Sequence, residues 1–203
     1  MKKLCKILAL SFIMASCSSS FNKKEYYAFL NDADNGYVVK RKVGDKQITG
    51  KYLPMEYMIL RDISNGGKNY IDSVKNRYSD SRTFLLTIEG IEKDRALIYN
   101  DLSDYKEYQE RIYTLNFDMK EFFSLKTSTE NYKPVLVTAE NTYGLQKSLN
   151  LVLVFAKKNE TDDLMNSDKY DLVFNDEVFR TGINHFVFYR SNIDKEVKLK
   201  IES

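Results

Sequence analysis

The sequence predicts an α+β protein rich in β-strands, with an antiparallel sheet or sandwich in its C-terminal half and a smaller α+β part before it. Three observations support this class. Short apolar runs typical of strands fill the second half, the first half combines a hairpin signal with a helical repeat, and only two prolines interrupt the chain. With 43% hydrophobic and 13% aromatic residues, the chain can bury a sizeable core.

The chain begins with the layout of a secretory signal peptide. A basic start is followed by a short apolar stretch, residues 8–14, and by the small residues Ala15 and Ser16. This stretch is far shorter than the roughly 20 residues needed to cross a bilayer, so we expect cleavage rather than a permanent helix. We therefore assign residues 1–16 to a signal peptide.

The tetrapeptide Met14-Ala15-Ser16-Cys17 resembles the lipobox of bacterial lipoproteins. The resemblance implies that the Cys17 thiol is joined to diacylglycerol and that the signal is cut before Cys17. Each buried methylene contributes about 0.8 kcal/mol, and two or more acyl chains anchor a protein stably, so the membrane is the first expected partner. Residues 17–24 are polar and predict a lipidated tether that holds the folded body close to the bilayer.

The resemblance also bears on location. In diderm bacteria a serine after the lipidated cysteine, here Ser18, looks like an outer-membrane address. Bacteroidota lipoproteins sent to the cell exterior tend to carry an acidic cluster after the cysteine, whereas this chain has Lys23 and Lys24. We expect an outer-membrane lipoprotein, with the periplasmic face favoured over the cell surface.

Composition excludes several classes of function. Without its leader the chain is close to neutral, so nothing directs it to nucleic acid. Once Cys5 leaves with the leader and Cys17 carries lipid, no thiol remains for a disulfide or a nucleophile. The single histidine, His185, cannot build a zinc site of His and Cys ligands. No glycine-rich phosphate loop or dinucleotide fingerprint is present, so we expect no cofactor.

Two acidic segments invite a calcium interpretation but do not support it. Residues 31–36, NDADNG, match an EF-hand loop only in part, because Ala33 and Lys42 fall where oxygen ligands are needed. A turn leading into the first strand is expected there. Three aspartates share the loop 161–168, where we expect solvated carboxylates rather than a metal site.

The first half of the folded body, residues 25–110, is predicted to hold a hairpin, two or three helices and one strand. Strands are expected over 37–43 and 46–52, because Gly44-Asp45 suits a two-residue turn between them.

Helices and a further strand are expected after the hairpin. Pro54 suits the first turn of a helix within 53–63, and a second helix is expected over 69–78. Alternation over 82–91 predicts a strand. The inner face of that strand is expected to carry Phe84, Leu86 and Ile88.

Residues 103–119 are ambiguous. Apolar residues recur at three- and four-residue spacing, which predicts helix, but the end of the segment alternates apolar and polar residues, which predicts strand. Thr114 and Asn116 are poor helix formers. We therefore expect a helix over 103–110 and a strand over 111–119.

The second half, residues 111–203, is predicted to be an antiparallel β part that packs with the first half as one unit. Residues 133–141 and 149–156 flank a glycine-containing turn, and the apolar run 151–156 is typical of a buried central strand. Three more strands are expected over 169–175, 183–190 and 197–201.

Few residues qualify as candidates for a site. Glu140 and Tyr143 lie at the tip of a predicted hairpin, where a carboxylate and a phenol could contact a ligand or partner. His185 falls on a strand, and no serine lies in a G-x-S-x-G turn, so we expect a structural or surface histidine. A hydrolase acting through Glu89, Glu140 or Asp176 is a less favoured alternative.

Segments of small uncharacterised lipoproteins of Bacteroidota are similar to two parts of this chain. One is residues 51–60, KYLPMEYMIL, and the other is the pair of stretches 136–144 and 149–156. The similarity implies an envelope location and carries over no functional residue except Cys17. We predict a non-enzymatic, lipid-anchored protein that binds another envelope component, most simply an envelope protein. A carbohydrate- or peptide-binding lipoprotein is the alternative, because the chain has 15 tyrosines and no tryptophan.

Overall fold

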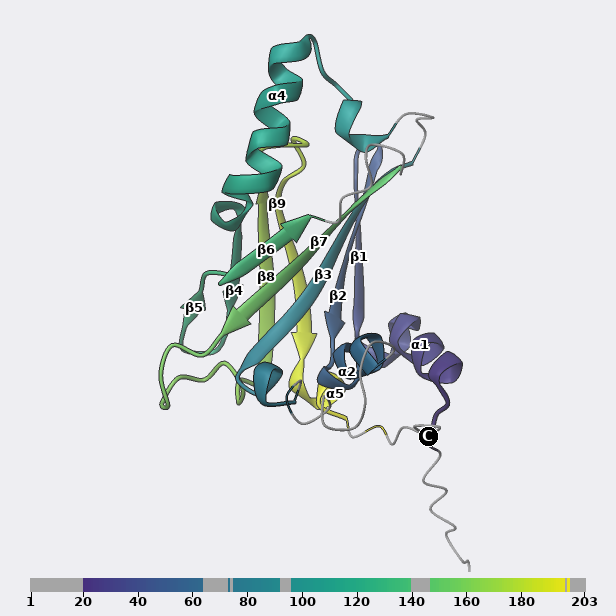
Figure 1. The fold of residues 1–203 in the computed structure, drawn as a ribbon, viewed down its shortest axis with the longest axis vertical. Coiled ribbons are helices and arrows are strands. Elements are labelled where there is room, and N and C mark those ends of the chain that lie inside the picture. Colours follow the sequence, from purple (N-terminus) through teal and green to yellow (C-terminus); the bar gives the residue numbers. More distant parts are fainter. Residues whose placement is uncertain are drawn as a thin grey trace, which may run out of the picture.

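The computed structural model describes residues 20–63, 73, 75–91, 96–139, 147–195 and 197. Two antiparallel sheets enclose the core, and short helices lie at both ends of the long axis (Figure 1). The predicted α+β class is therefore confirmed. No helix in the described part of the chain has the length and apolar character needed to span a bilayer. The assigned signal peptide, residues 1–16, lies outside the described residues.

One sheet has five strands in the order β1-β2-β3-β7-β6. Its strands are β1 (Val38–Val43), β2 (Lys46–Leu53), β3 (Ser81–Gly90), β6 (Leu136–Ala139) and β7 (Ser148–Ala156). Val43 pairs with Lys46, so Gly44-Asp45 forms the predicted two-residue turn, and Gly44 adopts a φ of 58°. β7 lies between β3 and β6, which confirms its prediction as a central strand.

The other sheet has four strands in the order β5-β4-β8-β9. Its strands are β4 (Phe123–Lys126), β5 (Asn131–Tyr132), β8 (Lys169–Asp176) and β9 (Gly182–Tyr189). β8 and β9 confirm two of the predicted strands. Of the strand expected over 133–141, residues 133–139 are described, and within them β6 forms the paired strand. The strand expected over 197–201 lies outside the described residues except for Val197.

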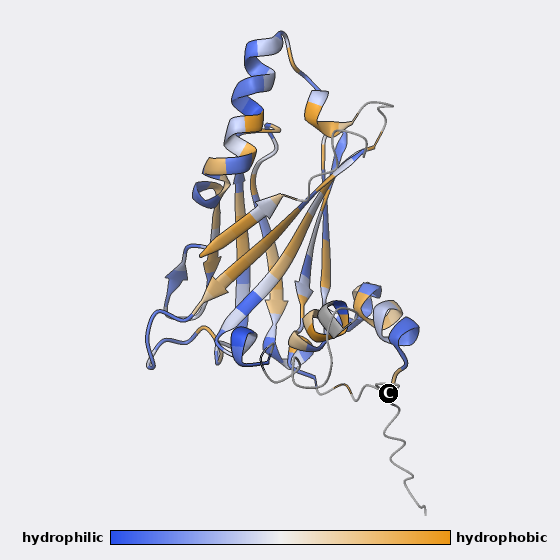
Figure 2. Ribbon diagram, viewed as in Figure 1, coloured by the Kyte–Doolittle hydropathy of each residue, from blue (hydrophilic) through white to orange (hydrophobic). Residues whose placement is uncertain are grey.

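The core lies between the two sheets, whose strands carry apolar residues along their length (Figure 2). The inner face of β3 is fully buried as predicted, through Phe84, Leu86 and Ile88. Gly50 on β2 faces Phe186 on β9, and a Cβ atom at Gly50 would lie 2.8 Å from Cγ of Phe186. Only a glycine fits between these strands. The sheets also meet at one edge, where Arg41 Nε donates to the carbonyl of His185 at 3.2 Å.

Arg82, a buried residue of β3, joins both sheets and the loop before β8. Its Nη1 donates to Tyr52 Oη at 2.7 Å and to Asp194 Oδ1 at 2.8 Å. Its Nη2 donates to the Met165 carbonyl at 2.9 Å, and to Tyr170 Oη and Asp194 Oδ2 at 3.1 Å each. Burial opposes the charge of Arg82, but Tyr52, Tyr170 and Asp194 outweigh it, so the guanidinium pKa is raised.

Helices close the two ends of the molecule (Figure 1). They are α1 (Lys23–Asn31), η1 (Ala33–Asn35), α2 (Met55–Ile63), η2 (Leu97–Tyr99), α4 (Tyr105–Tyr113), η3 (Thr114–Asp118), η4 (Met119–Phe122) and α5 (Arg190–Ile193). α2 confirms the helix predicted after Pro54. Of the helix predicted over 69–78, Ser73 and residues 75–78 are helical and the rest lies outside the described residues. η1 provides the turn expected before β1.

α1 was not expected, because residues 17–24 were assigned to a tether. The helix begins with a capping box in which Asn22 Oδ1 accepts from the Glu25 N–H at 3.0 Å and Glu25 Oε2 accepts from the Asn22 N–H at 2.9 Å. The ring of Phe21 packs 5.3 Å from that of Phe29. The folded body therefore already includes Phe21.

The strand predicted over 111–119 is wrong. α4 continues without a break through η3, a π-helical turn, into η4. Leu115 and Met119 are buried, whereas Phe117 is 69% exposed, so one face of a helix is turned to the core. Tertiary packing here outweighs the poor helix propensity of residues such as Asn116.

Candidate functional site

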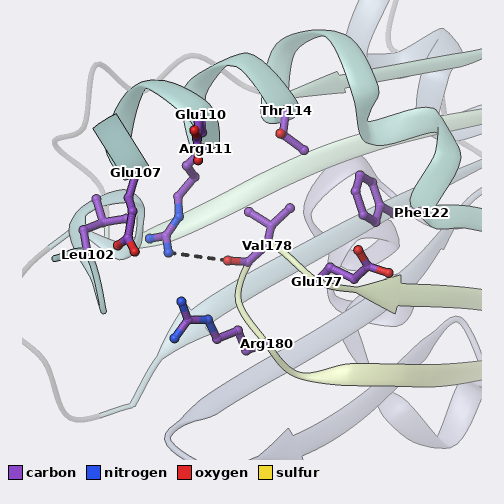
Figure 3. A pocket seen from close by; sticks show the side chains of 9 residues that line it. All are labelled: Leu102, Glu107, Glu110, Arg111, Thr114, Phe122, Glu177, Val178 and Arg180. Atoms are coloured by element: carbon purple, nitrogen blue, oxygen red, sulfur yellow. Dashed lines mark hydrogen bonds between the residues drawn. The ribbon is translucent and has the colours of Figure 1, made fainter. Parts of the chain in front are cut away.

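A pocket lies between α4 and the loop that joins β8 to β9 (Figure 3). Its volume is about 300 Å³, at the lower end of the range of small-molecule sites. Nine residues line it, and most of them are charged. The charged residues are Glu107, Glu110, Arg111, Glu177 and Arg180.

The α4 wall of the pocket follows from helix geometry. Asp104 caps the helix by accepting from the Glu107 N–H at 2.9 Å, and Glu107 Oε2 accepts in return from the Ser103 N–H at 2.7 Å. Helical spacing then places Glu107, Arg111 and Thr114 along one face, where they line the pocket. The sequence signal for this wall is the capping pattern, an aspartate followed three residues later by a glutamate.

Arg111 supports the floor of the pocket. Its side chain is buried, and Nη1 donates to the carbonyls of Ile98 at 3.2 Å and Asn100 at 2.6 Å. Nη2 donates to the carbonyl of Val178 at 3.4 Å, and the guanidinium lies 5.3 Å from the ring centroid of Phe179. One side chain therefore connects η2, α4 and the β8–β9 loop.

The β8–β9 loop is fixed by the nearly inaccessible carboxylate of Asp176. This group accepts from the N–H groups of Phe179 at 2.9 Å and Thr181 at 3.1 Å, and from the Thr181 hydroxyl at 2.5 Å. Asn184 Nδ2 donates to Thr181 Oγ1 at 3.1 Å. Within this loop Arg180 adopts a φ of 58°, a left-handed conformation that is unusual for a residue other than glycine.

The charges on the pocket do not neutralise one another locally. Burial lowers the pKa of Arg111, nearby Asp101 opposes this shift, and Arg180 adds to it. Within the described ranges, Arg111 and Arg180 form no ion pair with a carboxylate, and Glu177 forms none with a cationic side chain. The site thus brings together charged groups that remain able to bind a ligand.

A stack of tyrosines lies on η2 and on α4, the helix that lines one side of the pocket. The rings of Tyr99 and Tyr108 are 5.4 Å apart and nearly parallel, and Tyr105 stacks on Tyr108 at 5.9 Å. Tyr105 is 70% exposed and Tyr99 43% exposed. The abundance of tyrosine is plain in the sequence, but this grouping is not, because η2 and α4 are separate elements.

Of the residues considered for a site, the structure describes Glu89, Asp176 and His185. Cys17, Glu140 and Tyr143 lie outside the described residues, so their roles stay predictions. Glu89 is a surface residue that accepts from Gln47 Nε2 at 3.5 Å. Asp176, the third carboxylate considered for hydrolysis, is engaged within its own loop.

His185 lies on the outer face of β9, away from the buried rings of Phe186 and Phe188, as predicted. Its Nδ1 is 2.9 Å from Oδ2 of Asp171 on β8. This pair is partly exposed and does not line the pocket.

The acidic loop 161–168 differs in part from its prediction, because Asp162 and Asp163 accept structural hydrogen bonds, whereas Asp168 is exposed as expected. Asp163 accepts from the Thr127 hydroxyl at 2.6 Å, the Thr129 N–H at 3.2 Å and the Tyr132 hydroxyl at 3.2 Å. Burial opposes ionisation of Asp163, but these hydrogen bonds outweigh it and lower its pKa. Among the described residues, no group of three or more His, Cys, Asp or Glu side chains could hold a metal ion.

Comparisons with known proteins leave the site without a precedent. No protein-family model matches the chain, and no curated protein matches its sequence. One similar solved structure is the crystal structure of a protein of unknown function from Burkholderia pseudomallei K96243. Its TM-score is 0.38 and its sequence identity 9%, over 80% of this chain and 82% of the other. So low a TM-score supports no conclusion about function.

Proposed function

We propose that this chain is a lipid-anchored, non-enzymatic binding protein of the cell envelope, held at the membrane through acyl chains on Cys17. The short apolar leader and the lipobox-like tetrapeptide that ends at Cys17 support the anchor. The start of α1 at Lys23 leaves only a short link between the lipid and the folded body.

The main support for a binding role is the position of the pocket relative to the N-terminal helix. The pocket-forming helix α4 and the N-terminal helix α1 lie at opposite ends of the long axis (Figure 1). A short link at Cys17 would hold the α1 end near the bilayer and direct the pocket away from it. Anchoring then confines the protein to two dimensions and raises its effective concentration near membrane partners.

Binding is favoured over hydrolysis by the arrangement of the carboxylates. A hydrolase that works through two carboxylates needs them to face one substrate. Asp176 is instead held by the N–H groups of Phe179 and Thr181, and Glu89 lies at the surface of β3. Three carboxylates, Glu107, Glu110 and Glu177, do share the pocket. They line it together with two arginines, and Glu107 accepts from the Ser103 N–H, so this mixture of charges suits recognition of a charged ligand or partner.

The proposed location is the periplasmic face of the outer membrane. Ser18 and the absence of an acidic cluster before α1 support this choice. An envelope protein that meets the α4 end is the proposed partner.

The anchor is tested by metabolic labelling with an alkyne fatty acid in a diderm host. Wild type is expected to become labelled and to fractionate with membranes, while Cys17→Ala is expected to lose the label. Equal labelling of both proteins would refute the anchor. Crosslinking in the native membrane, followed by mass spectrometry, should recover a reproducible envelope protein linked to residues of α4.

A second candidate function is carbohydrate binding at the tyrosine stack, and the exposure of Tyr105 favours it. Aromatic side chains with a polar tip suit contacts to sugars. A glycan array distinguishes this function from protein binding. Tyr78→Ala is the control, because Tyr78 precedes β3 in the sequence and does not belong to the stack. Glycan binding that is lost in Tyr105→Ala but kept in Tyr78→Ala would support carbohydrate binding. The absence of any glycan hit would exclude it.

A further inference from the structure

The pocket between α4 and the β8–β9 loop has two oppositely charged ends. Arg111 and Arg180 point to one side of Val178, whereas Glu177 lies on the other side, toward Phe122 (Figure 3). Glu177 and Arg180 belong to the same short loop, yet in the described structure they form no ion pair with each other. One cavity therefore presents separate cationic and anionic groups.

At the cationic end, Arg111 and Arg180 form no ion pair among the described residues, while Glu107 lies beside Arg111 (Figure 3) and, with Asp101 and Asp176, favours its charge. Arg111 is buried, and the partners of its guanidinium are the backbone carbonyls of Ile98, Asn100 and Val178. Arg180, which lowers the pKa of Arg111, faces the same cavity. Two guanidinium groups that repel each other at one site favour an anionic ligand group between them, and arginine binds carboxylates in a bidentate manner.

The other carboxylates of the pocket are already engaged by α4 itself. Glu107 accepts from the Ser103 N–H at 2.7 Å, and Glu110 lies 3.7 Å from the ammonium of Lys106. Glu177 is exposed and has no such partner among the described residues. It is thus the group that can accept hydrogen bonds from a cationic ligand group.

The loop keeps the two charged ends apart. Asp176 holds the N–H groups of Phe179 and Thr181, and the Val178 carbonyl is bound by Arg111 at 3.4 Å. These contacts fix the left-handed conformation of Arg180, whose φ is 58°. A loop fixed in this way is preorganised, so ligand binding does not have to order it.

We propose that this pocket binds a dipolar ligand, with a carboxylate against Arg111 and Arg180 and an ammonium group against Glu177. A short peptide with free ends has this chemistry, and the volume of about 300 Å³ suits a ligand of that size. This assignment rests on the proposed binding function and names the class of ligand for it.

The test uses full-length protein, purified from membranes in detergent, and trialanine as the probe. Saturation-transfer NMR titrations compare trialanine with its C-terminal amide and its N-acetyl form. Each capped peptide is expected to bind at least about tenfold more weakly, because each loses a charge-assisted hydrogen bond. In Arg180→Gln, the difference in affinity between trialanine and its C-terminal amide should shrink. In Glu177→Gln, the difference in affinity between trialanine and its N-acetyl form should shrink.

Arg180 and Glu177 are both exposed, so their variants should fold, and Arg190→Gln serves as a control at an exposed arginine paired with Asp168. The proposal is overturned if trialanine does not bind, if capping either end has no effect, or if the Arg180 and Glu177 variants behave like the control. A protein that is lipidated at Cys17 and crosslinks to a partner, but fails these titrations, refutes the ligand class and leaves the proposed function intact.

Discussion

Arg82 and Asp194 form a bidentate ion pair, with Nη1–Oδ1 and Nη2–Oδ2 distances of 2.8 and 3.1 Å. The Arg82 side chain is 5% exposed and lies on β3, whereas Asp194 follows α5 and is 37% exposed. The pair therefore fastens the segment after α5 to β3 in the five-stranded sheet. Without Asp194, a buried guanidinium would keep its charge but lose its counterion.

We predict that Asp194→Ala lowers the free energy of unfolding by about 1.5–3 kcal/mol, because the buried Arg82 guanidinium loses charge-assisted hydrogen bonds to a partly exposed carboxylate. Asp168→Ala is the matched control, because Asp168 pairs with Arg190 at the same 2.8 Å but is 86% exposed. Its loss should stay below about 1 kcal/mol. Urea unfolding of both variants measures the difference, and equal losses would contradict a structural role for the buried pair.

Gly50 is predicted to be indispensable where β2 meets β9. A methyl group there would lie 2.8 Å from the Phe186 ring, so Gly50→Ala should cost about 1–3 kcal/mol through overpacking. Gly90→Ala, also in a strand, places its methyl 3.4 Å from Asn100 Nδ2 and should change stability little. In thermal unfolding, Phe186→Leu should offset part of the Gly50→Ala loss. Strictly additive losses in the double variant would show that the two residues do not clash.

The strands could be predicted because their apolar residues alternate and one face is buried. On β3, burial of Phe84, Leu86 and Ile88 follows the period of two that the sequence displays. Gly44-Asp45 likewise determines its hairpin through local turn chemistry. Neither inference needs information from distant parts of the chain.

Residues 111–119 show where local patterns are insufficient. Both a helix and a strand place Leu115 and Met119 on one face, so the apolar residues alone do not decide between them. The two structures differ for Phe117, which a strand would bury together with Leu115 and which is instead 69% exposed. Contacts from Arg111 to distant carbonyls, including that of Val178, accompany the helix and cannot be read from the segment itself.

This difference yields a prediction for stability. Leu115→Ala should destabilise the protein by about 2–5 kcal/mol, because it leaves a cavity in the core. Phe117→Ala, although it removes more atoms, should cost about 0.5 kcal/mol or less at its exposed position. Denaturant unfolding compares the two variants. Losses of similar size would favour the strand in place of the helix.

The pocket was not predicted, because its residues come from segments far apart in the sequence. Arg111 is a helix residue and Arg180 a loop residue, and neither belongs to a recognisable motif. Their convergence depends on how α4 packs over the β8–β9 loop. The predicted candidates Glu140 and Tyr143 rest on residue type at the tip of an expected hairpin, and residue type alone does not specify which side chains share a cavity.

Asp163 is predicted to make stability depend on pH in the acid range. Its pKa in the folded protein is lowered, because hydrogen bonds from Thr127, Thr129 and Tyr132 outweigh the effect of burial. In the unfolded chain an aspartate has a pKa of about 3.9. The stabilisation by Asp163 is therefore complete above that value and is lost as the pH falls through the lower, folded pKa.

Asp163→Asn should accordingly be less stable than wild type at neutral pH. This gap, the difference in the free energy of unfolding between the two proteins, should narrow as the pH falls below about 4. Asp168→Asn is the control from the same loop, because its carboxylate is 86% exposed and should produce a smaller gap. Urea unfolding at a series of pH values measures both gaps. A gap for Asp163→Asn that stays constant or widens on acidification would mean that its ionised carboxylate does not hold the loop. A gap that closes for Asp163 alone would identify its hydrogen bonds as the acid-sensitive contacts between this loop and the segment that joins β4 to β5.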